Sequence, residues 1–259
     1  MDLTALKDLL DSYVEIYNNP AFIEDDPISI PHLFSNRKDI EIIGLWTALL
    51  SWGLRKTIIN KSRELCEIMD YEPYDFIMNH TDNDLKRVVN FKHRTFNGTD
   101  ALCMVSFFKW YYSQYDSLED AFIPGKSMEG EYMKHGIYKF HQTFLRAPDY
   151  VVRTRKHVAN PMSKSSCKRI NMYLRWMVRS DDQGVDFGLW RKIEMNRLMI
   201  PLDVHVYRVA LKLGLVNRKQ TDWVTVENLT KKLRLLNPDD PVIYDYALFG
   251  MGIESKSGI

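Results

Sequence analysis

Lys168 is the residue of this sequence whose type and surroundings point most directly to covalent chemistry. It follows a turn rich in Pro and Ser and lies in the first turn of a helical pattern that runs from Ser165 to Arg179. A cation in the first turn of a helix opposes the helix dipole, and the neighbouring Arg169 is also cationic. Both effects favour the neutral amine, which is the nucleophilic form. Lys168 is therefore a candidate nucleophile, and the alternative is that it only contacts phosphate.

Asp203 is the second candidate, because it occupies the N-cap position of the helix predicted for residues 203–214. Asp is a preferred N-cap residue, so capping alone explains its presence. A capping carboxylate is also ionised and rigidly held, and beside a substrate it can stabilise a cationic sugar or relay a proton. Asp245, between two tyrosines on the last predicted helix, is a subordinate candidate.

A basic segment surrounds Lys168. From residue 153 to residue 169 the chain contains no acidic residue, although its net charge is only +1. Clustered cations and the free N–H groups of a helix N-terminus both favour phosphate. This segment is predicted to clamp backbone phosphates, and a solvated charged loop is the alternative. With His205 on the next helix, the predicted nucleic-acid contacts are Arg153, Arg155, Lys156, His157, Lys164 and Arg169.

The elements that must position these residues are predicted to be helices. Apolar residues recur every three or four positions, and strand-like alternation is almost absent. The fold class is therefore all-α, with about ten to twelve helices. The predicted helices cover residues 3–17, 40–50, 57–70, 73–80, 82–90, 100–115, 129–145, 165–179, 203–214, 224–236 and 241–252, the last with Asp240 as its cap and Pro241 as its first residue.

Composition excludes several classes of protein. The 259 residues carry 35 Lys and Arg against 34 Asp and Glu, which excludes a uniformly basic coat for nucleic acid and an acidic tail. The three cysteines cannot supply the four thiolates of an ordinary iron–sulfur cluster, and no spacing resembles a zinc site. We therefore expect no metal and no organic cofactor. No window approaches 18 apolar residues and the N-terminus has no apolar signal core, so we expect a cytoplasmic monomer without membrane contact.

Together these segments resemble the helix-hairpin-helix DNA glycosylase superfamily over roughly residues 40 to 253. SSCKRINMYLRWMV resembles the helix that follows the hairpin, with Lys168 at the position of the catalytic lysine. IPLDVHVYRVALKLGL resembles the segment that carries the family's aspartate, matched by Asp203. ALLSWGLRKTIINKSREL and FKHRTFNGTDALCM resemble the early helix pair and the segment before the hairpin.

Two departures from the superfamily bear on this resemblance. The hairpin segment ANPMSKSSCKR lacks the usual pair of glycines, which let backbone N–H groups approach phosphate closely. Lys168 and Asp203 are also 35 residues apart, which is longer than in most of the superfamily. The archaeal 8-oxoguanine glycosylase branch shares both features and is the nearest analogue. The same motifs are similar to those of a bacterial family with this fold whose activity is unknown.

The resemblance implies a two-lobed helical fold with a central cleft that receives a base flipped out of duplex DNA. Residues 39–180 would form the lobe with the hairpin. Residues 1–38 and 181–259 would together form the other lobe. Lys168 and Asp203 would then face each other across the cleft.

The activity that the resemblance implies is that of a DNA glycosylase of base-excision repair, a hydrolase with or without lyase activity. Lys168 would attack the sugar, Asp203 would stabilise charge, and the partner would be double-stranded DNA with a damaged base. The alternatives are a non-catalytic nucleic-acid-binding protein that retains the fold and an enzyme of this fold with another nucleoside or nucleic-acid substrate.

Overall fold

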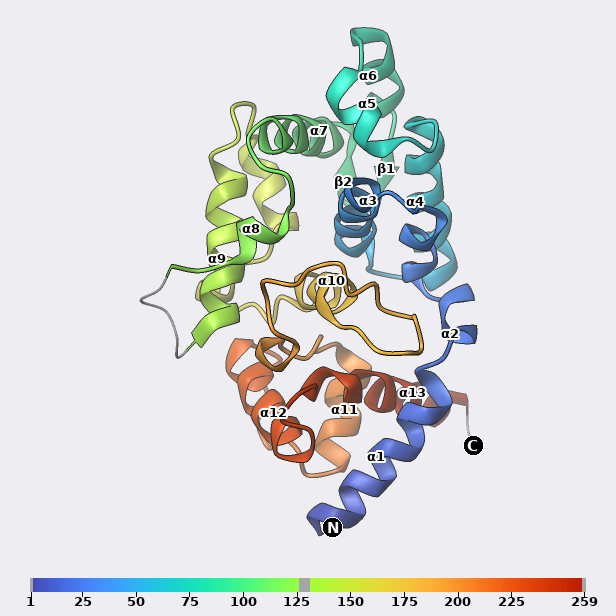
Figure 1. The fold of residues 1–259 in the computed structure, drawn as a ribbon, viewed down its shortest axis with the longest axis vertical. Coiled ribbons are helices and arrows are strands. Elements are labelled where there is room, and N and C mark those ends of the chain that lie inside the picture. Colours follow the sequence, from blue (N-terminus) through green and yellow to red (C-terminus); the bar gives the residue numbers. More distant parts are fainter. Residues whose placement is uncertain (1, 126–130, 258–259) are drawn as a thin grey trace. The chain divides into compact units, whose positions relative to one another are not determined.

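The computed structural model describes residues 2–125 and 131–257, and the described part is mostly helical (Figure 1). This confirms the all-α class, since the strands of the described ranges are two residues long each and form one short hairpin. None of the helices in these ranges is both long enough and apolar enough to span a membrane.

The chain divides into two compact units. The first unit contains Met1–Phe22 and Asn160–Ile259, and the second contains Ile23–Ala159. The predicted boundaries, which placed residues 39–180 in one lobe, differ from this division. Residues 160–180 lie in the first unit because their helix is bound to the chain that follows it: Phe187 N–H donates to Trp176 and Trp190 N–H donates to Met177, at 2.8 and 2.9 Å.

Two short 3₁₀ helices, Pro27–Ser29 and Pro31–Leu33, lie near the start of the second unit. The centre of this unit is an apolar helix, α3, in which every residue from Ile40 to Leu50 is buried. Aromatic side chains of α7 and α9 complete the core, with Phe107 5.0 Å from Phe144 and 6.0 Å from Phe140 between ring centroids. The helices and strands of this unit are α2 (Ala21–Glu24, which starts at the end of the first unit), α3 (Arg37–Leu50), α4 (Arg55–Ile68), α5 (Pro73–Asn79), α6 (Asp82–Val89), β1 (Lys92–His93), β2 (Phe96–Asn97), α7 (Gly98–Tyr112), α8 (Glu119–Phe122), α9 (Tyr132–Leu145) and η4 (Val152–His157).

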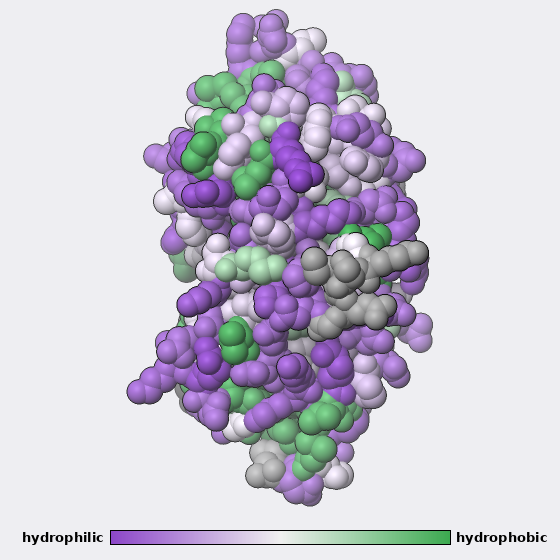
Figure 2. Space-filling view, turned by 90° about the vertical axis from the view of Figure 1, so that its left-hand side faces the viewer, coloured by the Kyte–Doolittle hydropathy of each residue, from purple (hydrophilic) through white to green (hydrophobic). Residues whose placement is uncertain are grey.

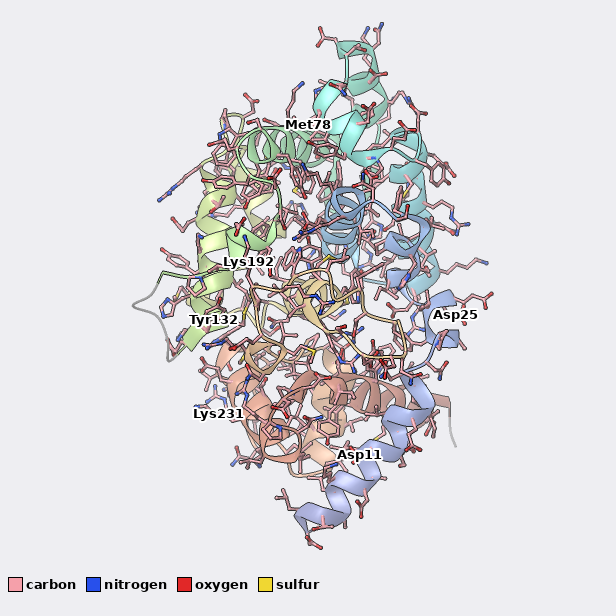
Figure 3. The ribbon with its side chains drawn as sticks, viewed as in Figure 1. Asp11, Asp25, Met78, Tyr132, Lys192 and Lys231 are labelled. Atoms are coloured by element: carbon pink, nitrogen blue, oxygen red, sulfur yellow. The ribbon has the colours of Figure 1, made fainter. Side chains whose placement is uncertain are left out.

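The first unit is assembled around its last helix, against which α1 and α11 both pack (Figure 1). Gly250 makes the contact with α1 possible, because a Cβ there would lie 2.2 Å from the ring of Tyr17. The hydroxyl of Tyr244 also donates to Asp11, which Figure 3 labels on α1. The helices of this unit are α1 (Leu3–Tyr17), η5 (Pro161–Ser163), α10 (Lys168–Val178), η6 (Met195–Arg197), α11 (Val204–Lys212), α12 (Trp223–Leu236), η7 (Pro241–Ile243) and α13 (Tyr244–Ser257).

Most predicted helices agree with the structure to within a few residues. The helix predicted for 129–145 begins at Tyr132, and the first positions of that prediction, 129 and 130, lie outside the described residues. The prediction for the last helix was wrong in one detail. Asp240 makes no side-chain cap bond, because its carboxylate accepts instead from Arg179, and the segment opens as the 3₁₀ turn η7.

Candidate functional site

The turn before α10 has the backbone geometry that glycine usually provides, although no glycine is present. Lys164 and Cys167 both lie in the left-handed region, with φ of 63° and 50°. A residue with a side chain costs about 1 kcal/mol or more in this conformation. Local hydrogen bonds hold the turn: Asn171 donates to the Ser166 carbonyl at 3.1 Å, and Cys167 N–H donates to Ser165 Oγ at 3.2 Å. The missing glycine pair therefore does not prevent a tight turn here.

This turn delivers Lys168 as the first residue of α10. Its side chain is half-buried, and its Nζ lies 3.4 Å from the sulfur of Met172 one turn along the helix. A thioether is a weak acceptor. Within the described part of the chain no carboxylate oxygen lies at ion-pair distance from this amine. The amine is thus held in place without a counterion bound to it.

Asp203 is the N-cap of α11, as predicted. Its Oδ1 accepts from the N–H groups of His205 and Val206, at 2.8 and 2.9 Å. Its Oδ2 accepts no hydrogen bond from any residue that the structure describes, and the side chain is half-exposed. One oxygen therefore fixes the orientation of the carboxylate, while the other is open to a substrate or a proton.

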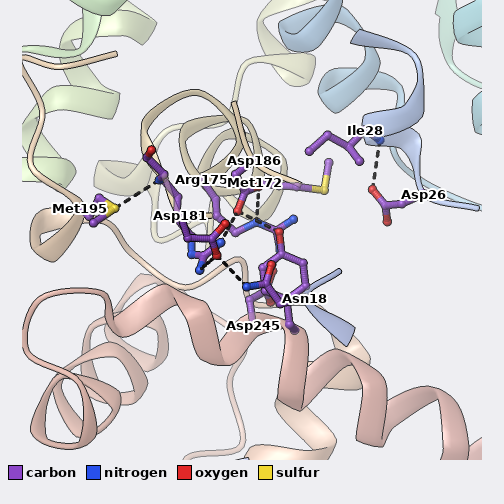
Figure 4. Close-up of polar contacts among 12 residues, drawn as sticks. Asn18, Asp26, Ile28, Met172, Arg175, Asp181, Asp186, Met195 and Asp245 are labelled. Carbon is purple, nitrogen blue, oxygen red and sulfur yellow. Dashed lines mark hydrogen bonds and ion pairs between the residues drawn. The ribbon is translucent and has the colours of Figure 1, made fainter. Parts of the chain in front are cut away.

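Asp245, in the first turn of α13, lies where the charges of both of these residues act on its carboxyl group. It is 6% exposed and forms an ion pair with Arg175 of α10 (Figure 4). Burial raises the pKa of its carboxyl to about 6; the positive charges of Arg175 and Lys168 oppose this rise, and the negative charge of Asp203 adds to it. Lys168 and Asp203 are both near enough to Asp245 to influence its proton. The structure therefore places both predicted catalytic residues near Asp245 in one unit. The prediction had placed them on two different lobes.

A buried network of charges supports this neighbourhood, and the sequence reading missed it. Arg175 donates to Asp186 at 3.2 Å and stacks its guanidinium over the ring of Tyr246, 4.5 Å from the centroid. Arg179, one turn later, is fully buried; burial lowers the pKa of its guanidinium, but the surrounding carboxylates raise it overall. The acceptors of Arg179 are Asp240 at 2.8 Å, Asp186 at 3.1 Å and Asp181 at 2.6 Å. The two arginines are four residues apart, one on α10 and one at its C-cap. This spacing is the feature of the sequence that could have indicated a shared network.

The predicted phosphate contacts are divided between the units, since the boundary at residues 159 and 160 falls inside the basic segment. Arg155 and Lys156 are exposed on η4 of the second unit, and Lys164 is exposed in the first unit. Arg169 is half-buried, and burial lowers the pKa of its guanidinium. These three exposed side chains are accessible to solvent, two in the second unit and one in the first.

Arg153 and His157 have interior partners instead. Arg153 forms an ion pair with Asp100 at 3.3 Å and donates to Asn97. His157 is 2% exposed, with Nε2 3.4 Å from the same Asp100 and its ring against Phe96. The prediction that His157 contacts phosphate was wrong, because a side chain at this depth is not accessible to a ligand at the surface.

His205, the predicted contact on α11, is used in helix packing. The centroid of its ring is 6.5 Å from that of Phe249. A Cβ on Gly252 would lie 2.8 Å from the Cβ of His205. Both partners belong to α13. Over the described ranges, no group of three or more His, Cys, Asp or Glu side chains is arranged to hold a metal ion.

Comparison with known proteins adds a family. A sequence model described as "Protein of unknown function (DUF2400)" matches residues 26–254. No curated protein and no solved structure matches the chain.

Proposed function

We propose that this chain, which belongs to the DUF2400 family, excises damaged bases from duplex DNA by the chemistry of a DNA glycosylase. Lys168 is the nucleophile and Asp203 is the carboxylate that stabilises charge. The observation that carries the proposal is the state of Asp203: one oxygen caps α11, the other is free, and Lys168 lies in the same neighbourhood.

The reaction follows from these two groups. The lone pair of the Lys168 amine forms a bond to C1′ of the sugar, and the bond from C1′ to the base breaks. The base leaves with the electron pair of the broken bond and takes up a proton from solvent. The free oxygen of Asp203 stabilises the cationic sugar and accepts the proton that the amine loses. Opening of the sugar ring then produces a Schiff base on Lys168, from which strand cleavage can follow.

A base inside a duplex is not accessible to such a pair, so the nucleotide must be extruded first. Exposed cations that bind backbone phosphate hold the duplex while this happens. Arg155 and Lys156 in one unit and Lys164 in the other are suitable contacts. The left-handed turn at residues 164–167 supports the same role, because it precedes a helix N-terminus that no side chain caps.

The test is a panel of duplexes that each contain one damaged base. Borohydride captures a Schiff base covalently, and alkaline cleavage reveals base release where no Schiff base accumulates. We expect wild-type protein to process at least one lesion and Lys168→Gln to abolish trapping. Lys212→Gln is the matched control, because it removes an exposed cation of the same unit that is not among the proposed phosphate contacts, and it should leave trapping intact.

Asp203→Asn tests the second residue. Asn caps a helix about as well as Asp, so the fold should persist. The neutral amide cannot stabilise a cationic sugar or accept a proton, so single-turnover rates should fall by about 10²-fold or more. Wild-type turnover in both Lys168→Gln and Asp203→Asn would refute the assignment. Duplex binding by the wild type without processing of any lesion would favour the binding-only alternative.

A further inference from the structure

A second concave site lies in the first unit, beyond the C-terminal end of α11. The loop that follows α11 and the exposed face of α12 enclose a pocket of about 310 Å³. Figure 3 labels one of its cations, Lys231, on α12. Among the residues that the structure describes, the pocket lining contains three cations, two amide side chains and no acidic residue; the polar members are Asn217, Arg218, Asn228, Lys231 and Lys232.

The polar groups of this pocket are largely uncommitted. Lys231 and the two asparagine side chains form no hydrogen bond or ion pair with the rest of the described chain. Arg218 donates through Nε to Thr225 and through Nη2 to Asp222, at 3.2 and 2.8 Å, which leaves Nη1 available. Lys232 donates to the Gly214 carbonyl at 2.9 Å, and an ammonium has two further donors.

The loop that carries these donors is held in place by its own contacts. Leu215 and Val216 are 3% and 6% exposed and anchor it in the core of the unit. The hydroxyl of Tyr207, on α11, donates to the Arg218 carbonyl at 2.7 Å. A loop held in this way loses little conformational freedom when a ligand binds, so its donors are preorganised.

We propose that this pocket is a phosphate-binding site. Two lysines and a guanidinium surround a space without carboxylates, and Asp222 neutralises only one of these three charges. A phosphate group has several anionic oxygens pointing in different directions, so it can accept from the ammonium, guanidinium and amide donors together. No neutral ligand of this volume would compensate the remaining positive charge.

The phosphate is that of a nucleic-acid backbone or of a free phosphomonoester. Contact with the turn before α10 favours the backbone: Trp223 N–H donates to the Lys164 carbonyl at 3.3 Å, and Ser165 pairs with Asp222. The pocket is roughly 14 Å from Asp203, given a 9-residue helix that rises about 1.5 Å per residue. It would therefore hold a phosphate some nucleotides away from the reacting sugar, and this form of the proposal rests on the proposed function.

Two binding experiments separate these sources. The first titrates inorganic phosphate and a nucleoside monophosphate while recording the side-chain amide NMR signals of Asn217 and Asn228. The second measures the affinity for a 20-base-pair duplex from 50 to 200 mM salt. The pocket variant is Lys231→Gln with Lys232→Gln. The control is Lys7→Gln with Lys86→Gln, which removes the same charge from exposed positions outside the pocket.

We expect the pocket variant, and not the control, to lose the NMR response and to bind duplex more weakly. Its slope of log affinity against log salt should become shallower by about two, close to 0.9 for each lost contact. Loss of the NMR response with unchanged duplex affinity would support a site for free phosphomonoesters. Such a response, lost in the pocket variant, would support the site even if the protein processed no lesion. If both measurements gave the same result for the pocket variant and the control, the proposal would be overturned.

Discussion

Glu41 of the second unit and the aspartates around Arg175 and Arg179 of the first unit are buried in different ways. In the second unit, Glu41 is fully buried and accepts mainly from neutral donors: the hydroxyl of Tyr112 at 2.7 Å, the hydroxyl of Ser117 at 2.6 Å and the N–H of Leu118 at 3.0 Å. The cation that reaches it, Arg37, has a side chain that is 46% exposed. Glu41 thus fixes the end of α7 to α3 while little positive charge is buried with it.

In the first unit, buried carboxylates meet buried cations instead. Arg175 and Arg179 are 4% and 0% exposed, and four aspartates surround them. Each buried ion costs several kcal/mol of desolvation, and apolar residues of similar size often give equal or greater stability. Because the charges of Lys168 and Asp203 act on Asp245 of this network, we interpret the network as electrostatic support for the proposed site. The contrast is therefore between a carboxylate satisfied mainly by neutral donors and carboxylates satisfied by buried cations.

The largest expected effect tests the difference in how the two units satisfy their buried charges. Arg179→Met should leave Asp181 and Asp240 without their cation, because Asp186 keeps Arg175, and should destabilise the protein by about 3–5 kcal/mol at neutral pH. Glu41→Gln keeps one acceptor oxygen for its neutral donors and should cost roughly 1–3 kcal/mol. Urea unfolding followed by circular dichroism measures both. A smaller loss for Arg179→Met than for Glu41→Gln would contradict the contrast between the units.

A second prediction concerns pH. The pKa of Asp245 is raised from 3.8 to about 6, so its stabilising contribution is complete below pH 3.8 and is lost as pH rises through 6. The stability of the wild type relative to Asp245→Asn should therefore fall by on the order of 3 kcal/mol between pH 4 and pH 7. Urea titrations of both proteins at several pH values provide the measurement. A constant difference across this range would show that the Asp245 proton is not linked to folding.

The second unit should respond to pH in the opposite direction. Burial lowers the pKa of His141 and of His93. Their contribution to stability is present above the ordinary histidine value of about 6.5 and is lost as pH falls. The comparison with Asp245→Asn cancels these histidines, because both proteins contain them.

The smallest expected effect tests whether Asp203 is structural, like Glu41, or belongs to the site. Asp222 caps α12 with nearly the same backbone angles, φ −104° and ψ −178° against −105° and −176° at Asp203. Each change to Ala should therefore cost about 1 kcal/mol of stability. Asp222→Ala should keep turnover on a processed lesion, whereas Asp203→Ala should lose it. Equal turnover in the two variants would make Asp203 a cap and nothing more.

The sequence by itself determined the features that depend on neighbours along the chain. Apolar spacing located the helices. The position of Lys168 in the first turn of α10 and the cap of α11 at Asp203 were predicted because caps and first turns are local structures. The absence of the glycine pair left the approach of backbone N–H groups to phosphate open to question, and the structure shows that Lys164 and Cys167 adopt the left-handed conformation without glycine. Neighbouring hydrogen bonds hold that conformation, and their partners could not be deduced from composition.

Only the tertiary structure decided which charges are buried and which residues share a unit. His157 and Arg155 belong to the same basic segment. Asp100 and Phe96 contact His157 in the interior, whereas Arg155 is exposed. The spacing of Arg175 and Arg179 places them on the same side of a helix. Charged side chains ordinarily lie on the side that faces solvent. They are buried because aspartates from a loop and from α13, up to 70 residues away, compensate their desolvation. Such compensation exists only after distant segments have packed together, so no local pattern predicts it.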